Sequence, residues 1–327
     1  MLYLPMVQEE SWFESGDGTK LYLRRWRCAP DSTPQAVVHI LHGMAEHSLR
    51  YQRLAEKLCG YGIEVWAADQ RGHGRTADLS INEPGKGGIL GHCADKNTFD
   101  RVADDALGIN RAIRKTYPTV PLFLLGHSWG SFIAQHYIES RDSGDGIIDG
   151  CILSGTRGPA ELKMKAGLPL MVLLAVVCGQ RRGSPVARAM ADGPYSRPFR
   201  PNRTGFDWLS RDEAEVDGYI NSEFCGNLCS TGFYRDLIGG LCRIHHGDAI
   251  AKIRKDLPIY VFSGNDDPVG DMGASPTALV NAYRSIGIAD LEFVLYPGAR
   301  HETLNETNRE EVMGSLLSWI CRHCGKE

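Results

Sequence analysis

Residues 121–130 read Pro-Leu-Phe-Leu-Leu-Gly-His-Ser-Trp-Gly, and they predict a buried strand that turns sharply into a helix. The first five residues form a short apolar run, and residues 131–139 have helical spacing. In a Gly-x-Ser-x-Gly turn the serine lies at the tip in a strained conformation, with its Oγ exposed. Gly126 and Gly130 leave room for the strand and the helix to approach. We therefore expect Ser128 to be a nucleophile at the end of a strand.

Strand-like and helical segments alternate on both sides of this stretch. Further strands are predicted at residues 20–27, 36–41, 63–68, 150–154, 258–263 and 291–296. Further helices are predicted at residues 51–58, 99–115, 277–285 and 308–321. This alternation predicts the α/β class, with a mostly parallel central sheet flanked by helices.

The alternation breaks between residues 157 and 246. This stretch holds six prolines, helical pieces and no convincing buried strand. The simplest account is an α/β core formed by residues 1–156 and 247–327, interrupted by a helical cap or lid at 157–246.

An acid and a base follow the serine in the order that a hydrolase of this architecture requires. Asp266 and Asp267 come after one predicted strand, and His301 comes after the next. A serine hydroxyl needs a neighbouring base to take its proton, and a buried acid orients that base. We expect His301 to be the base, while the residues alone leave Asp266 and Asp267 as alternative acids.

Two backbone N–H groups must also face the oxygen that becomes negative during the reaction. One is expected from Trp129, directly after the nucleophile. The other is expected from the loop that follows residues 36–41, and we place it on Met44.

Several of these motifs together resemble a known family. His42-Gly-Met-Ala-Glu-His-Ser48, Asp69-Gln-Arg-Gly-His-Gly74 and the serine pentapeptide resemble the monoacylglycerol lipase and lysophospholipase group of α/β-hydrolases, with a serine aminopeptidase S33-type hydrolase domain. Residues 206–217 and 297–302 resemble bacterial members. The resemblance implies an α/β-hydrolase fold, Asp267 as the acid of a Ser128-His301-Asp267 triad, Met44 and Trp129 as oxyanion donors, and a cap over an acyl-chain pocket. The cap sequence departs from the mammalian type, so acyl-length and head-group preference do not transfer.

Composition narrows the function classes. The chain has 327 residues, 43% of them hydrophobic, and a formal net charge of -4 with the two signs interleaved, which argues against nucleic-acid binding. The ten cysteines show no repeating framework and the first residues show no secretory signal, so we expect a cytoplasmic protein. Cys321-Arg-His-Cys324 supplies too few ligands for a tetrahedral zinc site. We expect no metal and no organic cofactor.

The expected activity is hydrolysis of monoacylglycerols or lysophospholipids through an acyl-enzyme. The alternatives are an esterase or thioesterase on other small acyl substrates, and a non-catalytic ligand receptor on the same fold. The apolar run 168–178, flanked by basic residues, either covers the acyl pocket, which we favour, or docks peripherally on a membrane. His39, His42, His47 and His73 are expected to have structural roles, and His127 occupies the variable position of the serine pentapeptide.

Overall fold

The structure is a computed structural model of the chain. It describes residues 6–28, 32–78, 89–144, 146–159 and 162–325. The described residues form an eight-stranded sheet in the order β1-β2-β4-β3-β5-β6-β7-β8. The strands are β1 (Val7–Glu14), β2 (Lys20–Arg27), β3 (Ala36–Leu41), β4 (Ile63–Ala68), β5 (Leu122–His127), β6 (Gly150–Ser154), β7 (Ile259–Gly264) and β8 (Leu291–Tyr296). Strands β4, β3, β5, β6, β7 and β8 run parallel, while β1 and β2 pair antiparallel at one edge.

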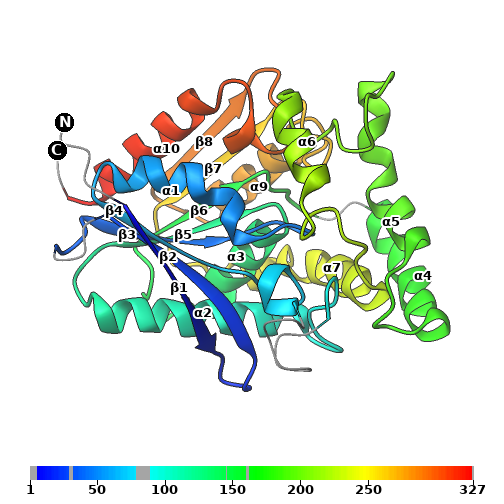
Figure 1. The fold of residues 1–327 in the computed structure, drawn as a ribbon, viewed down its shortest axis with the longest axis horizontal. Coiled ribbons are helices and arrows are strands. Elements are labelled where there is room, and N and C mark those ends of the chain that lie inside the picture. The colour runs from blue at the N-terminus through cyan, green and yellow to red at the C-terminus, as the bar shows by residue number, and fades with distance from the viewer. Residues whose placement is uncertain (1–5, 29–31, 79–88, 145, 160–161, 326–327) are drawn as a thin grey trace.

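Helices cover both faces of this sheet (Figure 1). They are α1 (Gln52–Cys59), α2 (Thr98–Thr116), α3 (Trp129–Ser140), α4 (Leu162–Cys178), α5 (Pro185–Ala191), α6 (Glu213–Asn221), α7 (Thr231–Ile244), α8 (Gly247–Ile250), α9 (Ala274–Ser285) and α10 (Arg309–His323). Helices α1 and α10 share one apolar core with one face of the sheet, and α2, α3 and α9 share a second core with the other. Side chains of β5 alternate between these cores, because successive residues of a strand point to opposite faces. The predicted α/β class with a mostly parallel sheet is confirmed.

Strand β1 was not predicted from the sequence. Its residues, Val-Gln-Glu-Glu-Ser-Trp-Phe-Glu, pair with β2 along their whole length. Most of these side chains are exposed because β1 is an edge strand, so the apolar alternation that identifies a half-buried strand is weak.

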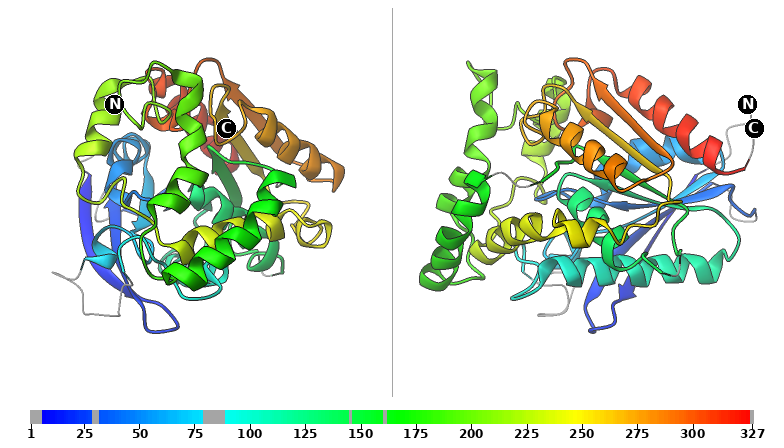
Figure 2. Two further views of the ribbon diagram at one scale, coloured as in Figure 1. Left: turned by 90° about the vertical axis from the view of Figure 1, so that its right-hand side faces the viewer. Right: turned by 180° about the vertical axis from the view of Figure 1, so that it is seen from behind.

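The predicted cap residues lie between β6 and β7 and contain α4, α5, α6 and α7. In the described part of this segment, no residue belongs to a sheet strand, and Gly183 and Ser230 form an isolated bridge. Figure 2 shows α4 and α5 beyond one end of the sheet, while α7 runs back along the core. The division of the chain at residues 157 and 246 remains a proposal.

A close backbone approach fixes the junction of β5 and α3. A Cβ atom added at Gly130 would lie 2.0 Å from the Leu41 carbonyl oxygen at the end of β3. Because the obstacle is backbone, no side-chain rotation relieves the clash. The requirement for glycine therefore comes from packing between α3 and β3.

We predict that Gly130→Ala lowers the free energy of unfolding by at least about 1–3 kcal/mol, the usual cost of an overpacked core. The matched control is Gly314→Ala in α10, where an added Cβ meets no atom within 4 Å. That change is expected to stabilise the helix by up to about 1 kcal/mol. Urea unfolding measures both, and equal stabilities for the two variants would contradict this account of the junction.

Candidate active site

Ser128 lies between β5 and α3 with φ 51° and ψ -121°. A non-glycine residue with positive φ is strained, and such strain persists only where the surrounding structure imposes it. The Ser128 N–H donates to the Ser154 carbonyl at 2.9 Å, and its own carbonyl accepts from the Ser131 N–H at 2.8 Å. These contacts hold the backbone so that Oγ faces the loop after β8.

That loop carries His301. Its Nε2 lies 2.8 Å from Ser128 Oγ, and its Nδ1 lies 3.0 Å from each carboxylate oxygen of Asp267. The loop after β7 carries Asp267, which also accepts from the Val269 N–H at 2.9 Å and from the Ser263 hydroxyl at 3.1 Å. Asp267 and His301 are buried, whereas Asp266 is exposed. Of the two adjacent carboxylates, the structure brings Asp267 to the imidazole.

The pKa of His301 is set by opposing effects. Burial disfavours the charged imidazole, but attraction to Asp267 and a hydrogen bond with it outweigh burial, so the pKa is raised above its ordinary value. Glu302 and Glu46 act in the same direction. Burial lowers the pKa values of the other histidines near the site. Those of His39, His47 and His127 fall to about 4, that of His73 falls to about 3, and that of His42 is also lowered. Among these histidines, His301 alone has a raised pKa.

The two predicted oxyanion donors lie beside the serine. Met44 lines the cavity that contains Ser128 and His301, and Trp129 is the first residue of α3. Among the described residues, neither backbone N–H has a hydrogen-bond partner. The N-terminus of α3 adds a favourable dipole for negative charge at this point.

A buried ionic network, two of whose carboxylates line the cavity around Ser128, was not predicted from the sequence. Arg50 lies 2.7 Å from Glu46 and pairs with both oxygens of Glu302 at 2.6 and 2.7 Å. Glu46 also accepts from the Gly43 N–H. Although burial opposes ionisation, the Arg50 guanidinium helps to hold the pKa of Glu46 at about 2. The network joins the Met44 loop to the residue after His301. Its signal in the sequence was that Glu46 lies within the His42–Ser48 motif, Arg50 follows that motif, and Glu302 ends the motif at residues 297–302.

A second cavity, of about 580 Å³, lies between the core and the predicted cap. Its apolar lining includes Phe132 of α3, Met164 and Met171 of α4, Leu241 of α7 and Val269. Phe132 is one helical turn beyond Ser128, and Val269 hydrogen-bonds to Asp267. This largely apolar chamber is therefore lined by residues that directly follow the acid and by a residue one helical turn from the serine, while Ser128 itself lines the other cavity.

The cavity around Ser128 also contains polar cap residues. Arg188 of α5 donates to the Gly226 carbonyl at 3.2 Å and lies over the Phe206 ring. Asp192 lies one turn further on, and burial raises its pKa to about 6 despite attraction to Arg188. In the described part of the chain, no group of three or more His, Cys, Asp or Glu side chains is placed to hold a metal ion.

Comparison with known proteins fits this geometry. Residues 32–308 match the family described as serine aminopeptidase, S33. The chain belongs to this family. It is a serine hydrolase, and its fold is the α/β-hydrolase fold, as the sequence motifs predicted.

Relatives of this serine hydrolase extend over nearly its whole length. It is 32% identical to human monoglyceride lipase, covering 94% of this chain and 87% of that protein. It is 30% identical to a monoacylglycerol lipase of Mycolicibacterium smegmatis, covering 97% and 98% of the two chains. Among solved structures, it is similar to a thermostable carboxyl esterase from Bacillus coagulans in complex with glycerol, with a TM-score of 0.85, 28% identity and coverage of 98% and 100%.

The charge of His301 gives a pH prediction. A general base must be neutral, so kcat/KM should rise with pH through an apparent pKa above 6.5, the ordinary value for histidine. Asp267→Asn should lower kcat by about 10⁴-fold, because the imidazole loses its orienting carboxylate. In this variant the rise of kcat/KM with pH (the acid limb of the profile) should move to lower pH, because burial lowers the pKa of His301 and the Asp267 charge no longer opposes it.

Asp266→Asn is the matched control for this experiment. Its exposed carboxylate makes no contact with His301 among the described residues, so kcat and the acid limb should stay close to wild type. A larger loss in Asp266→Asn than in Asp267→Asn would contradict the assignment of the acid.

Proposed function

We propose that this enzyme hydrolyses carboxylic esters of monoacylglycerols or lysophospholipids, with Ser128, His301 and Asp267 as its catalytic triad. The observation that carries the proposal is the Ser128–His301–Asp267 hydrogen-bonded chain beside an apolar cavity of about 580 Å³. A chamber of this kind suits an acyl chain, because burying it removes apolar surface from water. The lipase names of the relatives support the same substrate class.

In the proposed reaction, Ser128 Oγ attacks the ester carbonyl while His301 Nε2 takes its proton. The N–H groups of Met44 and Trp129 stabilise the oxyanion, and His301 then gives the proton to the leaving alcohol. Water attacks the resulting acyl-enzyme with His301 as base, which releases the fatty acid and restores Ser128. Asp267 orients the imidazole and stabilises its charge throughout. The reaction uses no metal and no organic cofactor.

A fluorophosphonate probe tests the nucleophile. Folded wild-type enzyme should be labelled, and Ser128→Ala should not be, because its side chain lacks the attacking oxygen. Ser318→Ala, which removes an exposed hydroxyl in α10, is the control and should label like wild type. Equal labelling of Ser128→Ala and wild type would remove the catalytic assignment.

The lysophospholipid alternative is favoured by Arg188, a cation in the cavity that contains Ser128. Its guanidinium donates to the Gly226 carbonyl at 3.2 Å, and the carboxylate of Asp192, one helical turn further on, attracts it. An arginine that has a backbone carbonyl as its partner retains donors for a phosphate.

A substrate panel with one acyl length separates the two substrate classes. The head groups are glycerol, glycerophosphocholine, p-nitrophenol and coenzyme A. Arg188→Gln should lower kcat/KM for the phosphate-bearing lipid by about 10-fold, the cost of one charged hydrogen bond, and should change the glycerol ester by less than about threefold. A coenzyme A ester as the best substrate would favour the thioesterase alternative.

We also propose that α4 contacts lipid surfaces. Met171 and Ala175 are buried on one side of α4, whereas Leu173, Val176 and Val177 are 57%, 77% and 72% exposed. An exposed apolar face next to basic residues, here Lys165 and Arg182, suits an anionic membrane surface. Within the described residues, no helix has the length and apolar character needed to cross a bilayer.

Co-sedimentation with anionic liposomes tests this contact. Replacing Leu173, Val176 and Val177 with Ser should lower the bound fraction several-fold, because each exposed apolar side chain adds to the buried area. Tyr61→Ser is the control, since this exposed residue lies in the turn before β4, at the end of the sheet opposite the cap. Unchanged binding of the triple variant would remove the membrane proposal.

A further inference from the structure

Residues 206–212 of the predicted cap are hydrogen-bonded to the loop that carries His301. The backbone N–H groups of His301 and Glu302 donate to the carbonyls of Trp208 and Leu209 at 3.3 and 2.8 Å. The indole ring of Trp208 also lies beside the imidazole, with ring centroids 5.2 Å apart. The position of His301 therefore depends in part on a segment that lies outside the sheet.

One carboxylate lies at the centre of this contact. Glu306 is fully buried, in the turn that leads into α10. Its Oε1 accepts from the backbone N–H groups of Arg211 and Arg300 at 3.0 and 2.9 Å. Its Oε2 accepts from Arg211 Nε at 2.8 Å and from the Thr307 N–H at 2.9 Å. Glu306 thus joins the cap segment, the residue before His301 and the start of α10.

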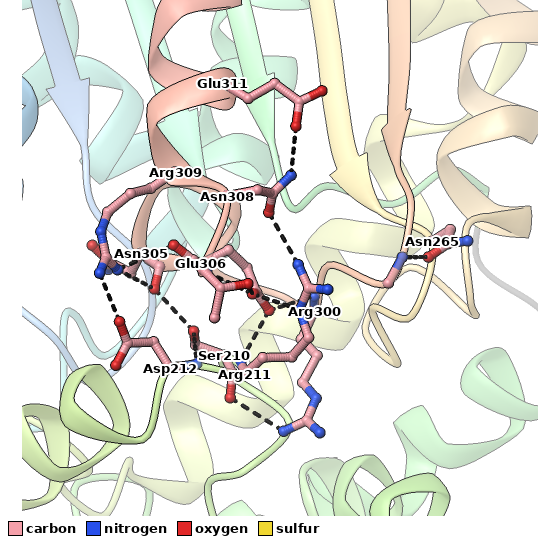
Figure 3. Close-up of polar contacts among 12 residues, drawn as sticks. Ser210, Arg211, Asp212, Asn265, Arg300, Asn305, Glu306, Asn308, Arg309 and Glu311 are labelled. Carbon is pink, nitrogen blue, oxygen red and sulfur yellow. Dashed lines mark hydrogen bonds and ion pairs between the residues drawn. The ribbon is translucent and has the colours of Figure 1, made fainter.

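Further polar contacts surround Glu306, as Figure 3 shows. The Ser210 hydroxyl donates to the Asn305 carbonyl at 2.9 Å, and Arg309 pairs with Asp212 at 2.6 Å. Both contacts join residues 206–212 to the same turn. Because a buried carboxylate with four donors forms strong, directional bonds, it fixes these segments more firmly than neutral contacts of the same number.

We propose that Glu306 is a positioning residue for His301. By binding both the segment 206–212 and the residue before His301, Glu306 couples the predicted cap to the catalytic base. The proposal rests on the proposed function, in which His301 takes the proton of Ser128. Glu306 acts in two ways. It holds the backbone of Arg300, and it holds Arg211 in the segment whose Trp208 carbonyl accepts a hydrogen bond from the His301 N–H. Glu306 lines neither the cavity that contains Ser128 nor the second cavity, between the core and the predicted cap. Residues 206–212 consequently belong to the catalytic scaffold, although they lie within the predicted cap.

The test is Glu306→Gln, assayed with p-nitrophenyl butyrate, a small ester that makes little use of the cap. The glutamine side chain has the same shape as glutamate, but its NH₂ group takes the place of one oxygen that accepts hydrogen bonds. That NH₂ group then faces N–H donors that it cannot bind. We expect kcat to fall about 10- to 100-fold, the effect of a misplacement of about 1 Å at the reacting atoms, with little change in KM. The acid limb of kcat/KM should also move to lower pH, because His301 loses part of its contact with Asp267.

Glu64→Gln is the matched control. Glu64 is a buried carboxylate at the start of β4, bonded to Arg25 and Trp66 at 2.6 Å, at the end of the sheet far from His301. The Glu64→Gln variant should be less stable than wild type, but its kcat and the acid limb of its kcat/KM profile should be unchanged. The proposal is overturned if Glu306→Gln behaves in the same way.

Arg211→Leu supplies the same test if Glu306→Gln fails to fold. It removes the bonds from Arg211 Nε to Glu306 and from Arg211 Nη2 to Asn308, but the backbone N–H of residue 211 can still donate to Glu306. We expect its kcat to fall about threefold or more with the same direction of pH shift, as a weaker form of the same misplacement. A wild-type kcat and acid limb in Arg211→Leu would then overturn the proposal. Wild-type enzyme that cleaves neither this ester nor a monoacylglycerol or lysophospholipid, or Ser128→Ala that cleaves the ester equally well, would instead reject the proposed function itself.

Discussion

The positive φ of Ser128 is imposed by its surroundings, and the active site is built on it. Glycine at position 130 lets the start of α3 approach the backbone of β3 more closely than any side chain would allow. This packing holds the serine at the tip of its turn, at the carboxyl edge of a parallel sheet. Because β7 and β8 end at the same edge, the loops that carry Asp267 and His301 meet there. The reacting groups come from distant parts of the sequence, and the direction of the strands brings them together.

Charges buried around this edge are paired, and the pairing serves geometry more than net stability. Replacing a buried ion pair with apolar residues is often neutral or stabilising, so the Arg50–Glu302 pair is weak evidence for stability. Its effect is directional, since it fixes the residue after His301, while Glu306 holds the residue before it. In our account the histidine loop is held on both sides by carboxylates, Glu302 in the lining of the cavity that contains Ser128 and Glu306 outside it.

Sequence patterns predicted the sheet more completely than the site. Strands such as 36–41 and 150–154 were found with their observed bounds, because central parallel strands give continuous apolar runs. The edge strand β1 gives no such run. Asp266 and Asp267 were not separated by the residues alone, since the turn decides which of two adjacent side chains points inward. Glu306 was missed because its partners, Arg211 and Arg300, come from loops whose mutual placement has no periodic signature.

The central claim is that Ser128 carries the acyl group during turnover. Mass spectrometry of enzyme quenched in acid during hydrolysis of a p-nitrophenyl ester tests it most directly. The account predicts an added acyl mass on the peptide that contains Ser128, present in wild type and absent in Ser128→Ala. An acyl group on another residue, or turnover that persists in Ser128→Ala, would contradict the account.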